Sequence, residues 1–165
     1  MRTEYLLHEQ VELVLHLLMP QNRLVMRVAL ATGLRIGDIL AMRPEKLKPR
    51  MTIREQKTGK SRRVTIPPAL LADLQANSGD HWVFPGRDPT QHRTRQAVWK
   101  DIKRAARACR FPQNVAPHSF RKVYAVELLR KYGDLKRVAK ALNHDRPEVT
   151  AVYAFADKWL TEKWK

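Results

Sequence analysis

The chain has 165 residues, of which 44% are hydrophobic, so one ordinary domain with a packed core is expected and wholesale disorder is excluded. It carries 32 Lys and Arg against 16 Asp and Glu, and this net charge of +16 favours nucleic acid as a partner over an anionic membrane surface or a merely solvated basic face. Cys109 is the only cysteine, which excludes an intrachain disulfide and a cysteine-based zinc cluster.

Helical periodicity dominates the first forty residues. The apolar pattern predicts a helix over Glu9–Met19, which Pro20 stops. A second helix is predicted from about Asn22 to Thr32, with Gly33 as its natural end. A short third helix is predicted over Ile36–Met42.

A β-hairpin is predicted in the next segment. Met51–Arg54 and Val64–Ile66 alternate in the manner of strands, and the intervening loop is centred on Thr58-Gly59. One side of each strand is polar, so we expect the hairpin on the domain surface. Thr58-Gly59-Lys60-Ser61 is similar to half of a phosphate-binding P-loop, but Arg54 replaces the required glycine and a strand follows, which excludes ATP binding here.

The rest of the chain is predicted to be helical in these segments: Ala69–Gln75, Arg93–Arg110, His118–Tyr132 with Pro117 in its first turn, Leu135–Leu142, Pro147–Ala154 and a tail helix. In the long basic helix, the residues predicted to face inwards are Val98, Trp99, Ile102, Ala105 and Ala106. We therefore expect a mainly α-helical single domain with a small antiparallel β-hairpin. The N-terminus lacks a signal-peptide pattern and no apolar run approaches the roughly 20 residues of a membrane span, so a soluble intracellular protein is expected.

Four separated segments carry the side chains of chemical interest: 31–40 (Ala-Thr-Gly-Leu-Arg-Ile-Gly-Asp-Ile-Leu), 57–60 (Lys-Thr-Gly-Lys), 117–121 (Pro-His-Ser-Phe-Arg), and 142–144 (Leu-Asn-His) with Thr150 and Tyr153 beyond it. In order and spacing they resemble the tyrosine recombinase, or phage integrase, family over about residues 7–159. The resemblance implies that residues 1–165 form one catalytic domain with that family's fold, and that the N-terminal core-binding domain of larger members is absent. The chain would then be either a fragment of a longer protein or a minimal recombinase.

The resemblance implies a site-specific DNA recombinase or integrase that cleaves and rejoins strands through a 3′-phosphotyrosine intermediate. Tyr153, nine residues beyond His144, matches the family's nucleophile, and Tyr5, Tyr124 and Tyr132 are its competitors. A phenol with a pKa of about 10 attacks only with help in losing its proton. Because the phosphotyrosine bond conserves the energy of the phosphodiester, neither ATP nor a metal or other cofactor is expected.

Two arginines and two histidines match the residues that bind the reacting phosphate in this family. Arg35 and Arg121 would supply forked guanidinium groups, which fit the charged non-bridging oxygens in shape and charge. His118 precedes Arg121 by three residues, so both lie on one helix face, and its imidazole would assist proton transfer. His144 resembles the family's second histidine, which binds a phosphate oxygen and positions the nucleophile.

A lysine and an aspartate complete the predicted site. Lys57 matches the family's general acid, which protonates the leaving 5′-oxygen, although chemistry alone does not separate it from Lys60. Asp38 lies three residues after Arg35, where the family prefers Glu, and is expected to support the arginine region through a buried hydrogen bond. Asn143 replaces a usual Gly before the histidine, and Asn tolerates the left-handed conformation that such a turn needs.

Double-stranded DNA is the expected partner, bound by a homotetramer on synapsed DNA and by a monomer before synapsis, with accessory DNA-bending proteins as further candidates. The resemblance places this protein in the bacterial cytoplasm, at the nucleoid. An apolar stripe of Phe155, Trp159 and Leu160 would pack on its own domain or on a neighbouring subunit. The alternatives are a catalytically inactive basic DNA-binding regulator and a type IB topoisomerase-like enzyme that relaxes supercoils.

Overall fold

The computed structural model describes residues 5–143, and the predicted helices over 147–154 and in the tail, with His144, Thr150 and Tyr153, lie outside these residues. The elements in chain order are α1 (His8–Leu17), α2 (Pro20–Thr32), α3 (Ile36–Leu40), the 3-10 turn η1 (Pro44–Lys46), β1 (Arg50–Arg54), β2 (Ser61–Thr65), α4 (Pro68–Asn77), α5 (Arg95–Ala108), α6 (Pro117–Tyr132) and α7 (Leu135–Ala141). The mainly helical architecture with one small antiparallel hairpin is confirmed. None of these helices is long and apolar enough to cross a membrane.

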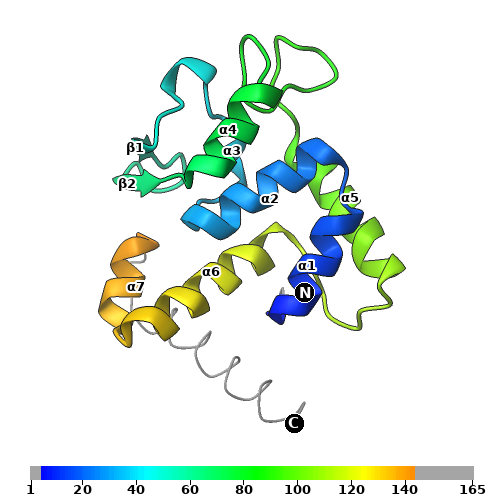
Figure 1. Cartoon of the computed structure of the whole chain (residues 1–165), viewed down its shortest axis with the longest axis vertical. Coiled ribbons are helices and arrows are strands. Elements are labelled where there is room, and N and C mark those ends of the chain that lie inside the picture. The colour runs from blue at the N-terminus through cyan, green and yellow to red at the C-terminus, as the bar shows by residue number, and fades with distance from the viewer. Residues whose placement is uncertain (1–4, 144–165) are drawn as a thin grey trace.

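Helix α2 is the centre of the core. It packs against α1, α3, α4 and α6, and α6 runs alongside it from α5 to α7 (Figure 1). Seven of its thirteen residues are buried. The largest fully buried side chains include Phe84 from the loop before α5 and Phe120 from α6, so segments far apart in sequence meet in one core cluster.

Prolines and glycines set the helix boundaries as the sequence predicts, with small shifts. Pro20 both follows α1 and opens α2, two residues before the predicted start, because its fixed φ suits a first helical position. Gly33 ends α2 in the left-handed conformation with φ +63°. A Cβ at Gly33 would also lie 2.3 Å from the ring of Tyr124, so any other residue there would require that ring to move. Asn143 has φ +52°, which confirms the predicted left-handed turn.

The hairpin forms with β1 and β2 in antiparallel register, from Arg50 opposite Thr65 to Arg54 opposite Ser61. Exposed and less exposed residues alternate along both strands, which confirms the predicted surface position. The turn over residues 55–60 closes through two backbone bonds: Glu55 N–H donates to the Lys60 carbonyl at 2.9 Å, and Gly59 N–H donates to the Glu55 carbonyl at 2.8 Å. This turn is therefore held in a defined shape beside α3.

The prediction that Trp99 faces inwards is wrong, because its side chain is 45% exposed. Val98, Ile102 and Ala105 are fully buried on the inner face of α5, as predicted. Trp99 lies one residue, or about 100°, round the helix from Val98 and so falls outside this stripe. There its ring meets the ammonium group of Lys103, 5.4 Å from the ring centroid.

Candidate active site

Four of the six residues predicted to be catalytic line one pocket of about 500 Å³. Arg35 stands at the start of α3, Lys57 in the hairpin turn, and His118 and Arg121 in the first turns of α6. The pocket thus collects side chains from three segments that are separated by about twenty to sixty residues. The other two predicted residues, His144 and Tyr153, lie outside the described residues.

Arg121 is fixed by backbone carbonyl groups from two other helices. Its side chain is buried, its Nη1 donates to the Gly33 carbonyl, and its Nη2 donates to the Leu142 carbonyl at 2.6 Å. Gly33 and Leu142 are the C-terminal caps of α2 and α7, where carbonyl oxygens carry the negative end of the helix dipole. The guanidinium group therefore joins the C-terminal ends of α2 and α7 to α6 at the pocket. Its partner Leu142 precedes His144 by two residues in the sequence.

Arg35 is held by a carboxylate that the sequence did not identify as a site residue. Its Nη1 donates to Oε2 of Glu55, whose side chain is completely buried while that of Arg35 remains 23% exposed. Burial alone would raise the pKa of Glu55, but the Thr58 hydroxyl and the Arg35 and Arg62 guanidinium groups lower it, so the carboxylate is ionised at neutral pH. The sequence signal was weak: an acidic residue two positions before a lysine in a basic hairpin.

Asp38 accepts its hydrogen bond from the hairpin rather than from Arg35. Its Oδ1 accepts from the backbone N–H of Gln56 at 2.9 Å, next to Lys57. The side chain is buried, and within residues 5–143 its second oxygen has no hydrogen-bond partner. The bond predicted to support the arginine region thus ties α3, which follows Arg35, to the turn that carries Lys57.

The two candidate lysines of the hairpin turn differ in whether they line the pocket. Lys57 lines it, whereas Lys60, the alternative general acid, is not among its lining residues.

Partial burial and then the positive charges of Arg121, Lys122, Arg35 and Lys57 lower the pKa of His118 to about 4. His118 is exposed at the pocket, so an incoming anion can approach its ring. Such an anion would offset the second cause of the lowered pKa, which is the charge of the neighbouring cations. At neutral pH this imidazole is uncharged and can accept a proton.

Two further pocket residues were missed by sequence reasoning. Arg95, in the first turn of α5, lies so close to Gly37 that a Cβ on Gly37 would be 2.3 Å from its guanidinium group. Gln56 also lines the pocket, between Glu55 and Lys57. The prediction of a long basic helix implied arginines in this region, but not that Arg95 reaches the pocket.

The tyrosines among the described residues lie elsewhere. Tyr5 is buried in the core, and Tyr132 stacks its ring on Arg137, whose guanidinium carbon is 3.7 Å from the ring centroid. Tyr124 packs against Gly33, and burial raises the pKa of its phenol, which makes it a poorer nucleophile. None of these three lines the arginine pocket.

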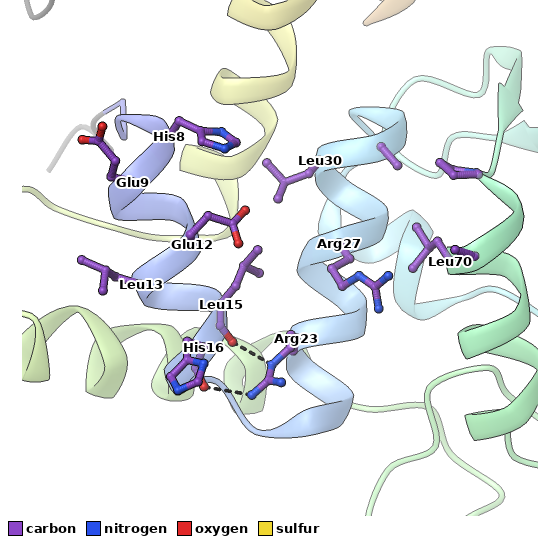
Figure 2. A pocket seen from close by; sticks show the side chains of 13 residues that line it. His8, Glu9, Glu12, Leu13, Leu15, His16, Arg23, Arg27, Leu30 and Leu70 are labelled. Carbon is purple, nitrogen blue, oxygen red and sulfur yellow. Dashed lines mark hydrogen bonds between the residues drawn. The ribbon is translucent and has the colours of Figure 1, made fainter.

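A second cavity, of about 1060 Å³, shares no lining residue with the arginine pocket. It lies between α1, α2 and the start of α4 (Figure 2). One of its polar side chains is bound within the chain: Arg23 donates to the Leu15 and His16 carbonyls, both at 2.8 Å. It is larger, but its two arginines share the lining with Glu9 and Glu12, and Arg27 pairs with Asp73, so we assign the chemistry to the arginine pocket. Within residues 5–143, no group of three or more His, Cys, Asp or Glu side chains is arranged to hold a metal ion.

Comparison with known proteins gives a consistent result. Residues 4–158 match the family model described as the phage integrase family. The integrase of Escherichia phage P2 is 31% identical over 163 residues, covering 97% of this chain and 45% of its own length. Tyrosine recombinase XerD of Rhizobium meliloti is 31% identical over 134 residues, covering 74% of this chain and 43% of its own length. The chain thus spans about half the length of these curated relatives.

A solved structure shares the fold. The lambda integrase tetramer bound to a Holliday junction aligns with a TM-score of 0.75 at 16% identity, over 93% of this chain and 48% of the lambda chain. At this identity the likeness concerns the fold alone.

Proposed function

Because this chain belongs to the phage integrase family of tyrosine recombinases, we propose that it cleaves and rejoins double-stranded DNA at specific sites through a 3′-phosphotyrosine intermediate. The observation that carries the proposal is the convergence of Arg35, Lys57, His118 and Arg121 on one pocket. The cations and the neutral imidazole suit the binding of a phosphate. No tyrosine among residues 5–143 lines the pocket, so the attacking tyrosine would come from another part of the chain. The net charge of +16 supports a polyanionic substrate.

Arg35 and Arg121 bind the scissile phosphate in this proposal. As a nucleophile adds to phosphorus, charge builds on the two non-bridging oxygens, and donors already fixed in place stabilise that charge without reorganising. Glu55 fixes Arg35, and the helix-end carbonyl groups fix Arg121. A guanidinium group has five N–H donors, so Arg35 can bind phosphate while it is paired with Glu55.

Proton transfer is divided between Lys57 and His118. The leaving 5′-oxygen becomes strongly basic and takes a proton from the Lys57 ammonium group, which lines the pocket. His118 is neutral at physiological pH because its pKa is about 4, so it can take up or relay the proton released by the attacking phenol. An approaching phosphate raises the pKa of His118 by offsetting the cations around it, which makes the imidazole a better base.

Tyr153 is the proposed nucleophile and His144 the residue that positions it. Their support is the family pattern, together with the finding that Tyr5, Tyr124 and Tyr132 do not line the pocket. Attack by Tyr153 Oη forms the phosphotyrosine bond and breaks the bond to the 5′-oxygen, which leaves as a hydroxyl. Reversal by a 5′-hydroxyl of another strand rejoins the DNA, so the energy of the phosphodiester is retained and neither ATP nor a metal ion is needed.

Synapsis of two DNA sites would require four copies, and we propose a homotetramer on DNA that is a monomer before synapsis. The lambda integrase tetramer on a Holliday junction has this fold and supports the assignment. We further propose accessory DNA-bending proteins as partners in the reaction.

The test is covalent capture from an immobilised library of nicked duplexes with randomised sequence. A nick beside the cleavage site lets the short 5′-hydroxyl fragment diffuse away, so that the protein–DNA adduct accumulates and survives a denaturing wash. The wild-type chain should retain DNA whose sequence then reports the target site, and Tyr153→Phe should retain none. Adduct that persists in Tyr153→Phe would eliminate this nucleophile.

Two other outcomes would replace the proposal. Sequence-specific binding in a gel shift, without adduct from the wild-type chain, would indicate a DNA-binding regulator. Relaxation of a supercoiled plasmid carrying the selected site, without strand exchange between two such plasmids, would indicate a type IB topoisomerase-like enzyme.

A further inference from the structure

The hairpin turn and the start of α3 meet at Glu55. This residue follows β1 directly, and its backbone closes the turn at both ends, through the N–H bond to Lys60 and the carbonyl bond from Gly59. Its side chain is completely buried, although it is charged. A carboxylate in that position costs much desolvation free energy unless it is paired.

The two carboxylate oxygens of Glu55 have different partners. Oε2 accepts from Arg35 Nη1 and from the Thr58 hydroxyl at 3.0 Å, so one atom joins α3 to the turn. Oε1 faces Arg62 Nε at 3.6 Å, while Arg62 Nη2 donates to the Thr32 carbonyl at 2.7 Å. Glu55 is thus shared between Arg35 on one side and the strand β2 on the other.

Lys57 lies between the bonded residues of this turn, two residues from Glu55 and one from Thr58. Its position in the pocket therefore depends on the shape that Glu55 imposes on residues 55–60. Arg35 depends on Glu55 directly. We infer that Glu55 is a positioning residue that sets the places of Arg35 and Lys57 together, an inference that rests on the proposed function.

Coupling of this kind has a chemical consequence. Arg35 acts on the non-bridging oxygens and Lys57 on the leaving oxygen, so one displaced carboxylate would weaken two separate contributions to the same step. Misplacing a reacting group by about 1 Å can slow a reaction roughly 100-fold. Loss of Glu55 should therefore leave a part of the slowing that remains even when the leaving group needs no proton from Lys57.

Two DNA substrates separate these contributions. In one, the leaving atom is the ordinary 5′-oxygen; in the other it is sulfur, which leaves without a proton and so bypasses Lys57. Glu55→Gln, which keeps the shape and removes the charge, should slow cleavage of the oxygen substrate about 100-fold, and the sulfur substrate should recover only part of this loss. Thr58→Val, which frees only the turn, should be slowed less and recover fully.

Controls keep the outcome decisive. Asp73→Asn removes the same charge from an exposed ion pair with Arg27, and it should leave both rates unchanged. If Glu55→Gln alone is poorly folded, the double variant Glu55→Gln with Arg62→Met also removes the cation that would be left buried, while Arg35 still loses its carboxylate. Rates are compared per folded molecule, measured by circular dichroism.

The inference is overturned if Glu55→Gln, or the double variant, cleaves both substrates at the rate of Asp73→Asn. It is also overturned if sulfur restores Glu55→Gln completely, since Arg35 would then not depend on Glu55. Failure of the wild-type chain to form adduct with either substrate refutes the proposed function instead. In that case hydrogen exchange at the Glu55 and Gly59 amides tests the anchoring directly: it should be faster in Glu55→Gln than in Asp73→Asn, and equal exchange overturns the inference.

Discussion

Replacing Gly33 by alanine tests how the fold positions Arg121. Gly33 has φ +63°, which costs a residue with a Cβ about 1–2 kcal/mol, partly offset by about 0.4–1 kcal/mol because alanine restricts the unfolded chain. The new Cβ would also lie 2.3 Å from Tyr124 Cδ1 and 3.1 Å from Leu142 Cδ2. Overpacking of this kind costs about 1–3 kcal/mol more, so Gly33→Ala should lose about 1–5 kcal/mol in total.

Gly133→Ala is the matched control. Gly133 caps α6 with φ +65°, nearly the same conformation, but nothing lies within 4 Å of the position that its Cβ would take. It should therefore show only the net backbone cost, about 0–1.5 kcal/mol. The difference between the two variants isolates the contact with Tyr124 and Leu142.

Urea unfolding followed by circular dichroism measures both variants, and thermal unfolding should place the midpoint of Gly33→Ala roughly 3–10 °C below that of Gly133→Ala. Tyr124→Ala combined with Gly33→Ala should be less destabilised than the sum of the single changes, because the ring that clashes is gone. Equal destabilisation at Gly33 and Gly133, or strict additivity with Tyr124→Ala, would refute the packing argument.

Three further outcomes follow from the pocket. Lys57→Ala should slow DNA cleavage by about 10²–10⁴-fold in the adduct assay, and Lys60→Ala by less than about tenfold, since only Lys57 lines the pocket. NMR titration should place the His118 pKa at about 4, and vanadate, which mimics phosphate, should raise it. Because this pKa is below the unfolded value of 6.5, the contribution of His118 to stability is complete above pH 6.5 and falls as the pH drops towards 4. This loss of stability should be absent in His118→Gln. Asp38→Ala should cost about 1–3 kcal/mol in urea unfolding because the Gln56 amide loses its acceptor, and Asp38→Asn, which keeps an acceptor, should cost less.

Local chemistry explains which parts of the fold were predictable. Helix ends at Pro20, Gly33 and Pro117 follow from the backbone preferences of single residues, which act the same way in any tertiary context. Trp99 was misplaced because the width of a buried helix face depends on the neighbouring helices, which periodicity does not reveal. The turn η1, three residues long, has too few residues to show a period.

The same distinction between predictable and unpredictable features holds for the residues of the site. The reactive side chains could be named from the sequence because their types and spacings match a pattern, but their supporting partners could not. Glu55 binds Arg35 across twenty residues, and Asp38 binds a backbone amide, which no sequence pattern records. Arg121 is bound by carbonyl groups, which every residue has, so only the fold shows which two are used.

The way each arginine is held decides how much positive charge remains for a phosphate. Arg35 is paired with the full negative charge of Glu55, which it shares with Arg62. Arg121 is instead held by the carbonyl ends of α2 and α7, which carry partial charges. Asp38 is the one acidic residue among the described residues that line the pocket, whereas Arg35, Lys57, Arg95 and Arg121 all line it. The described lining therefore carries more positive than negative charge, and this leaves the pocket able to attract an anion.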